Sequence, residues 1–388
     1  MNPKDFSEIK RRLDPSKRLP NEICGCYVSA EGEILATFRK PVALMPQQEL
    51  ERYMAIFRKV LTGTQGQQIL PVGFSATQPE PAFDLFLRLR QTMLADSELL
   101  DRLCGSVMAA LQQERAERPQ SMDAEKNAEC TLILLLGDGF DCYRRRRDGE
   151  YDREDSETMF TYFLCCVCPV KPRKPELAYQ GGDFALSDES MEVGMPVQGF
   201  LYPAREQGGA DIYTAMYYTR NPSSVSEAFM THVFGTENIP MPGGEQQEAL
   251  CAMMQETLAE ECSMEVMQAV HDRVSGMIQE QKEDRQADPL TLSCTDVTQM
   301  LSDCGVSGEK TEAFSDEFDE VFGPAAEIPA VNLVTPGRFR IDTPSVSIRV
   351  DPAHKDLIST RMIDGQRCIV ILADGAVEVN GVHIALSD

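Results

Sequence analysis

The spacing of apolar residues changes twice along this chain, and these changes limit what the chain can fold into. Up to about residue 238, short apolar runs typical of strands are mixed with helical patterns. From 239 to 326 the spacing is helical throughout, and from 327 to 388 apolar and polar residues alternate as they do in strands. We therefore expect an α+β domain at 1–238, a helical region at 239–326 and a small antiparallel β unit at 327–388.

The first part combines strands and helices without strict alternation. Ile23–Val28 and Glu33–Phe38 flank a turn that contains glycine, which is typical of a β-hairpin. Thr131–Leu136 and Met159–Val170 are apolar runs that predict buried strands. Helical spacing occurs at Leu50–Leu61, Phe83–Leu87 and Leu99–Leu111. This order favours an α+β fold with a mixed or antiparallel sheet over a parallel, doubly wound one.

The later parts are expected to be simpler. Glu245–Glu260 and Met264–Lys282 predict two long helices that pair, and two shorter helices follow at Thr295–Cys304 and Glu309–Phe322. In the last of these, Phe314, Phe318 and Phe322 form one stripe, which is more typical of a core than of a partner-binding surface. Asp364–Gly365 and Asn380–Gly381 stand between apolar runs and predict tight hairpin turns.

Charge and composition limit the partners and the location of the protein. The chain has 62 acidic and 37 basic residues, a net charge of −25, and this field repels nucleic acid and anionic lipid. No apolar stretch of about 18 residues occurs, and the first residues lack the apolar run of a secretory signal. The odd number of cysteines, 13, is typical of free thiols in a reducing compartment. We expect a cytoplasmic protein that binds neither nucleic acid nor membrane.

The most site-like segment is Gly137–Asp141, which follows a predicted buried strand. Carboxylates at the end of such a strand often hold a divalent cation that activates water. Asp138 and Asp141, joined by Asp211, would then support a metal-assisted hydrolase or phosphoesterase. The alternative is that Gly-Asp-Gly only forms a turn, because Asp bonds its own backbone there. The common zinc-protease, hydrolase and phosphate-binding motifs are absent, and only four histidines occur.

Two Cys-x-Cys pairs form a second candidate site. Cys24 and Cys26 fall in one predicted strand, and Cys166 and Cys168 fall in another. Because residues two apart in a strand share a face, neighbouring strands could present four thiolates to a metal ion or act as a redox sensor. The alternative is that these cysteines are small apolar residues of a core.

The run Arg144–Arg147 is the strongest cluster of positive charge in the sequence. Acidic residues surround it, so the local charges nearly cancel. We expect a solvated loop with internal ion pairs, and a docking loop is the functional alternative.

Several segments together resemble domain-of-unknown-function family 4317, a family of anaerobic gut bacteria. They are Ile23–Val28, Tyr162–Val170, Gly199–Ala204, Tyr217–Tyr218 and Val377–Val382. The resemblance covers nearly the whole chain and implies no activity, cofactor or catalytic residue. We therefore expect a non-enzymatic cytoplasmic binding or scaffold protein, whose terminal β unit serves a protein partner or self-association, and we assign no cofactor.

Overall fold

The computed structural model places most of the chain in two compact units. It describes residues 1–17, 20–74, 81–117, 130–141, 159–173, 177–180, 183–186, 191–206, 209–283, 289–324, 326–334, 339–373, 377–379 and 382–384. Unit 1 comprises Met1–Glu245 and Arg285–Pro289, and unit 2 comprises Gln246–Asp284 and Leu290–Asp388. The run Arg144–Arg147 lies outside the described residues.

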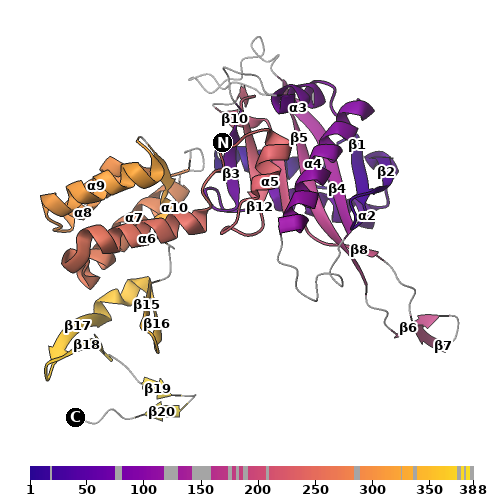
Figure 1. Cartoon of the computed structure of the whole chain (residues 1–388). Helices are drawn as coiled ribbons and strands as arrows, with labels where there is room; N and C mark the ends of the chain where they lie inside the picture. The colour runs from indigo at the N-terminus through magenta and orange to yellow at the C-terminus, as the bar shows by residue number, and fades with distance from the viewer. Residues whose placement is uncertain are drawn as a thin grey trace, which may run out of the picture. The chain divides into compact units, whose positions relative to one another are not determined.

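Unit 1 is built around one eight-stranded sheet (Figure 1). The strands follow the order β2-β1-β4-β5-β9-β12-β3, and β8 pairs with one end of β5. Their bounds are β1 Glu22–Val28, β2 Ile34–Pro41, β3 Ile69–Gly73, β4 Cys130–Asp141, β5 Met159–Pro172, β8 Met191–Val193, β9 Gln198–Tyr202 and β12 Thr214–Thr219. Every described pairing in this sheet is antiparallel, which confirms the α+β class and its antiparallel option.

Helices cover both faces of this sheet. Face A, which carries Cys24, Leu135 and Cys165, packs against α3 (Pro81–Gln91), α4 (Ser97–Glu117), α5 (Glu227–Phe229) and the π-helical turn η3 (Met230–Phe234). Face B, which carries Ile23, Leu134 and Cys166, packs against α1 (Pro3–Arg12) and α2 (Gln47–Val60). Because neighbouring residues of a strand point to opposite faces, a sheet covered twice needs the continuous apolar runs seen in β4 and β5.

The core on face A is aromatic. Phe86 of α3 is fully buried, and its ring centroid lies 5.0 Å from Phe200, 5.2 Å from Tyr202 and 5.6 Å from Phe234. Each such ring pair contributes about 0.5–1.5 kcal/mol beyond its buried area. The helices of face A are therefore tightly fixed on the sheet.

The edge strand β3 is an element that the apolar pattern did not predict. It has five residues, and Pro71 stands in its middle, which weakens a strand pattern. It pairs with β12 through Ile69, Leu70 and Val72, among others. Further short elements were also missed: β6 Leu177–Gln180, β7 Asp183–Leu186, β10 Ala204–Glu206, β11 Gly209–Asp211, β13 Thr291–Ser293, β14 Glu327–Pro329 and the 3-10 turn η1 Val42–Leu44.

Unit 2 begins with helices, as the sequence predicts. They are α6 (Gly243–Leu258, whose first turn belongs to unit 1), the turn η4 (Ala259–Glu261), α7 (Met264–Glu283), α8 (Cys294–Asp303), α9 (Gly308–Phe322) and α10 (Ala330–Leu333). Leu258, Val274 and Leu301 are fully buried where these helices meet. Phe314 and Phe318 are also fully buried, which confirms that their stripe belongs to the core.

Three hairpins close the chain. They are β15 Phe339–Asp342 with β16 Ser347–Val350, β17 Ile358–Ile363 with β18 Gln366–Ile371, and β19 Val377–Val379 with β20 Val382–Ile384, and the 3-10 segment η5 (Pro352–Leu357) precedes β17. Asp364 and Gly365 have φ of 50° and 78° between β17 and β18, which confirms the predicted two-residue turn. Asn380–Gly381 lies outside the described residues.

Candidate functional site

The segment Gly137–Asp141 is strand and not turn. β4 continues to Asp141, and Asp138 lies opposite Tyr162 of β5. The expectation of a Gly-Asp-Gly turn was therefore wrong. The physical reason is visible at Gly139, where a Cβ atom would stand 3.1 Å from the Thr161 side chain and 3.3 Å from a β5 carbonyl, so glycine lets the two strands remain paired.

Asp138 points into face B, where protein donors surround its carboxylate. Arg12 of α1 donates from Nε to Oδ2 at 2.6 Å and from Nη2 to Oδ1 at 3.1 Å. The Tyr162 hydroxyl donates to Oδ2 at 3.2 Å, and burial raises the pKa of Tyr162, which keeps that proton in place. The guanidinium of Arg12 also lies 5.2 Å from the centroid of the Phe140 ring. Asp138 therefore fastens α1 to the sheet.

The structure does not bring the three candidate carboxylates together. Asp138 and Asp141 are three residues apart in one strand and thus point to opposite faces. Asp141 is exposed at the end of β4. Asp211 is half-buried at the end of β11, and its Oδ1 accepts the backbone N–H of Tyr213 at 3.0 Å. A shared cation between Asp138 and Asp141 has no support in this geometry.

The two Cys-x-Cys pairs lie on different faces of the sheet. Cys24 and Cys26 point into face A, and Cys166 and Cys168 point into face B. The register explains this, because Gly25 and not a cysteine is aligned through Leu134 with Cys166. The four thiols therefore do not converge. Within the described part of the chain, no group of three or more His, Cys, Asp or Glu side chains is placed to hold a metal ion.

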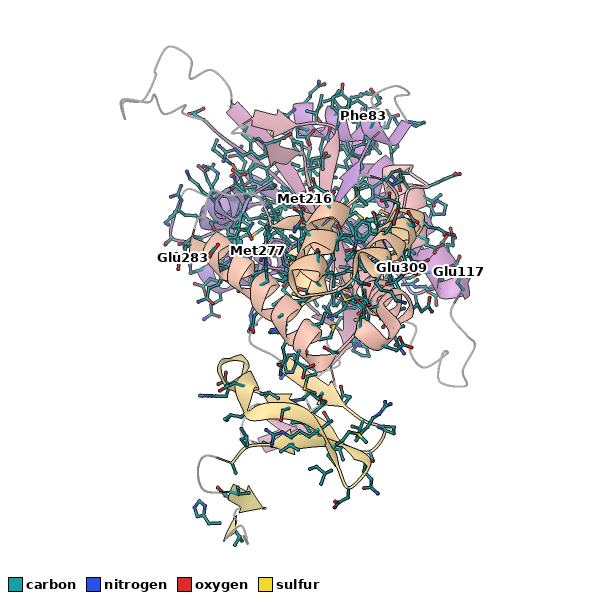
Figure 2. The ribbon with its side chains drawn as sticks, turned by 90° about the vertical axis from the view of Figure 1, so that its left-hand side faces the viewer. Phe83, Glu117, Met216, Met277, Glu283 and Glu309 are labelled. Carbon is teal, nitrogen blue, oxygen red and sulfur yellow. The ribbon has the colours of Figure 1, made fainter. Side chains whose placement is uncertain are left out.

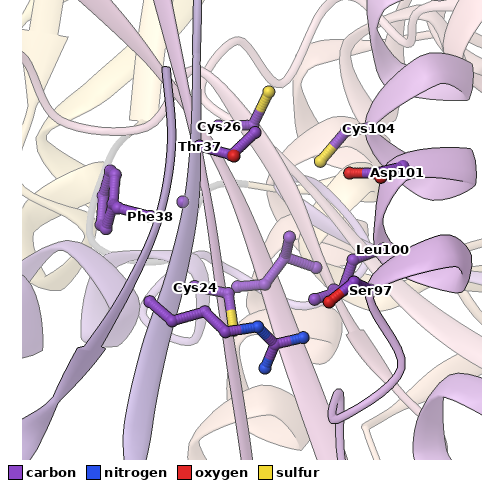
Figure 3. A pocket seen from close by; sticks show the side chains of 11 residues that line it. Cys24, Cys26, Thr37, Phe38, Ser97, Leu100, Asp101 and Cys104 are labelled. Atoms are coloured by element: carbon purple, nitrogen blue, oxygen red, sulfur yellow. The ribbon is translucent and has the colours of Figure 1, made fainter.

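A cavity of about 370 Å³ opens on face A between β1, β2 and α4 (Figure 3). It is lined by Cys24, Gly25, Cys26, Thr37, Phe38, Arg39, Ser97, Leu100, Asp101, Cys104 and Leu135. Arg39 is held at its rim, because it donates to Glu22 at 2.6 Å and to the Leu94 carbonyl at 2.8 Å. The cavity thus combines thiols, hydroxyls and a fixed cation.

Two of the lining thiols, those of Cys26 and Cys104, are neighbours in this cavity. Figure 3 shows Cys26 on β1 and Cys104 on α4 as neighbours in this cavity, with the Cys104 sulfur directed toward the strand. The interaction between the two neighbouring thiols lowers the pKa of Cys26 and raises that of Cys104. Sequence reasoning missed Cys104, because it is a single cysteine in the buried stripe of a helix and no spacing motif links it to Cys26.

The β17–β18 hairpin forms a second unusual surface. Met362 and Ile371 are 64% and 55% exposed, and they share one face of the hairpin with Ile369. We call these three residues the hairpin patch. Among the described residues of 339–384, Ile358 alone is buried. Figure 2 shows side chains of these hairpins extending away from the yellow ribbon.

The fold defines a two-unit α+β protein, with a thiol-lined cavity in one unit and apolar hairpins in the other. No helix within the described ranges has the length and apolar character needed to cross a membrane. The sequence matches the family described as Domain of unknown function (DUF4317) over residues 1–382. The chain belongs to this family. No curated protein matches the chain.

Proposed function

We propose that this chain is a non-enzymatic cytoplasmic binding or scaffold protein that associates with a second copy of itself through its terminal hairpins. The observation that carries the proposal is the exposure of Met362 and Ile371 on one face of the hairpin. Isolated two-stranded hairpins are marginally stable in water and need a further apolar contact. Burying one large apolar side chain contributes about 1.5–3 kcal/mol. A partner that covers Met362 and Ile371 would therefore stabilise the hairpin and the complex together.

The backbone of the hairpin adds a second reason. Within the residues that the structure describes, β17 and β18 pair only with each other. Each strand therefore presents one row of unpaired backbone groups to an incoming strand. Strand addition across a two-fold axis would satisfy these groups in both copies at once.

Charge favours a second copy at this surface. Residues 339–373 carry five basic and four acidic side chains and are nearly neutral. By contrast, residues 246–283 and 290–334 together carry seventeen acidic and three basic side chains. Two copies of a chain with a net charge of −25 repel each other over most of their surface, so contact through the neutral hairpins costs least.

The test is the oligomeric state of the full chain, measured by sedimentation equilibrium over a concentration series. We expect a dimer for the natural sequence and a monomer for the double variant Met362→Glu and Ile371→Glu. The matched control is Val321→Glu, which also places an acid at an exposed apolar position of unit 2 but lies on α9. The control should remain dimeric. A natural chain that stays monomeric at every concentration would refute self-association.

A further inference from the structure

The cavity on face A holds more thiol chemistry than a packed core requires. Cys26 and Cys104 come from different elements and meet at its wall, and Cys24 lines the same space. Cysteine in a core normally acts as a small apolar side chain packed on all sides. Here Cys26 and Cys104 are 1% and 5% exposed, but both residues line a space of about 370 Å³, against roughly 30 Å³ for one water molecule in the liquid. A molecule the size of a hydroperoxide fits there.

The thiols of this region differ in pKa. The thiolate is the reactive form of cysteine, so a thiol that ionises more easily reacts first. The interaction with the neighbouring Cys104 favours the thiolate of Cys26 and lowers its pKa. Burial raises the pKa of Cys24 to about 11, so this neighbour stays protonated near neutral pH. Cys26 is thus the nucleophile of the group, and Cys104 is the thiol placed beside it.

We propose that Cys26 and Cys104 form a redox-active dithiol that a small hydroperoxide entering the cavity oxidises to a disulfide. In the first step the Cys26 sulfur attacks the terminal peroxide oxygen and breaks the O–O bond. Cys26 becomes a sulfenic acid, and the other oxygen leaves as an alcohol, or as water when the oxidant is hydrogen peroxide. In the second step the Cys104 sulfur attacks the sulfenic sulfur, and the disulfide forms with loss of one water molecule.

The reaction balances without a cofactor. The two thiols together lose two electrons and two protons. The peroxide accepts these electrons and protons and is reduced to one alcohol and one water molecule, or to two water molecules when the oxidant is hydrogen peroxide. The disulfide joins β1 to α4 across the wall of the cavity, so oxidation draws the helix toward the sheet. A small dithiol or a thioredoxin-type donor would reverse the step by thiol exchange. This inference does not depend on self-association through the hairpin patch.

The test uses the full chain, fully reduced and then freed of reductant. It is treated with one equivalent of hydrogen peroxide, alkylated, digested and analysed by mass spectrometry. We expect a linked pair of peptides that contain Cys26 and Cys104 as the main product, and we expect dithiothreitol to release it. A product in which both cysteines remain alkylated, or in which other cysteines carry the oxidation, would overturn the proposal.

Two single variants sharpen the test. In Cys104→Ser the sulfenic acid of Cys26 has no partner, so dimedone should trap it at Cys26. The matched control is Cys165→Ser, which removes a buried thiol of the same face and should leave the disulfide unchanged. The proposal also fails if Cys104→Ser gives no dimedone adduct at Cys26 while its circular dichroism matches the natural chain.

Discussion

Replacing Asp138 by Asn tests the role of the one buried carboxylate in the Gly137–Asp141 segment. The substitution keeps the shape of the side chain but removes the negative charge beside Arg12. The Arg12 side chain is only 19% exposed and the Asp138 side chain only 11%. Water can therefore solvate the unpaired Arg12 charge only weakly in the variant. Breaking a buried ion pair lowers the free energy of unfolding by about 3–5 kcal/mol. Because Arg12 is partly exposed, we expect a smaller decrease, of about 2–3 kcal/mol.

Urea unfolding followed by circular dichroism measures this loss, because the chain has no tryptophan for fluorescence. Asp141→Asn is the matched control, since it changes an exposed carboxylate of the same strand and should alter stability by less than about 0.5 kcal/mol. In a double-mutant cycle, Arg12→Gln combined with Asp138→Asn should cost less than the sum of the single changes. Equal unfolding midpoints for the two Asp variants would refute the anchoring role of Asp138.

Two further predictions concern the sheet. Burial raises the pKa of Cys24 from 9.0 in the unfolded chain to about 11 in the folded protein. Because the folded state holds this proton more tightly, the protonated thiol contributes about 2–3 kcal/mol to the free energy of unfolding below pH 9, and this contribution is lost as pH rises through 11. Urea midpoints should fall less steeply over this range for Cys24→Ala than for the natural chain, and identical slopes would contradict the assignment. In Gly199→Ala the new Cβ would lie 2.4 Å from the carbonyl oxygen of Cys165, so thermal unfolding should show a loss of about 1–3 kcal/mol. The control is Gly105→Ala, at an exposed helical site where the new Cβ meets no atom within 4 Å, and it should raise stability by about 0.5–1 kcal/mol. A loss of stability in this control would show that the loss in Gly199→Ala does not come from the clash.

Local patterns predicted the elements and the fold class well where apolar residues repeat over many positions. The runs in β4 and β5, and the Phe314–Phe318 stripe, each place several apolar groups on one face. A long repeat of this kind predicts its helix or strand reliably, because the apolar face must be buried whatever the tertiary structure. The sequence did not predict β3, because its five residues are interrupted by Pro71 and show no repeat. The strand also depends on pairing with β12, which lies far away in the sequence.

The candidate site was harder to predict, because it depends on register and on distant contacts. Spacing alone shows that Cys24 and Cys26 share a face, and this holds in the structure. It cannot show which face Cys166 takes, since a shift of one residue in the pairing of β4 with β5 would exchange the faces. The partner of Asp138 is likewise hidden, because Arg12 is 126 residues away in sequence. The Cys104 thiol meets Cys26 only after α4 packs on the sheet.

The strand order has a consequence for the growing polypeptide on the ribosome. β3 is made early, but its neighbour β12 begins about 140 residues later. At about 5–20 residues per second, β3 waits roughly 7–30 s before it can join the sheet. During this time the central strands β4 and β5 leave the ribosome with apolar side chains on both faces. During this period the nascent chain therefore exposes a large apolar surface to which a chaperone can bind. In the completed sheet the same surface is buried.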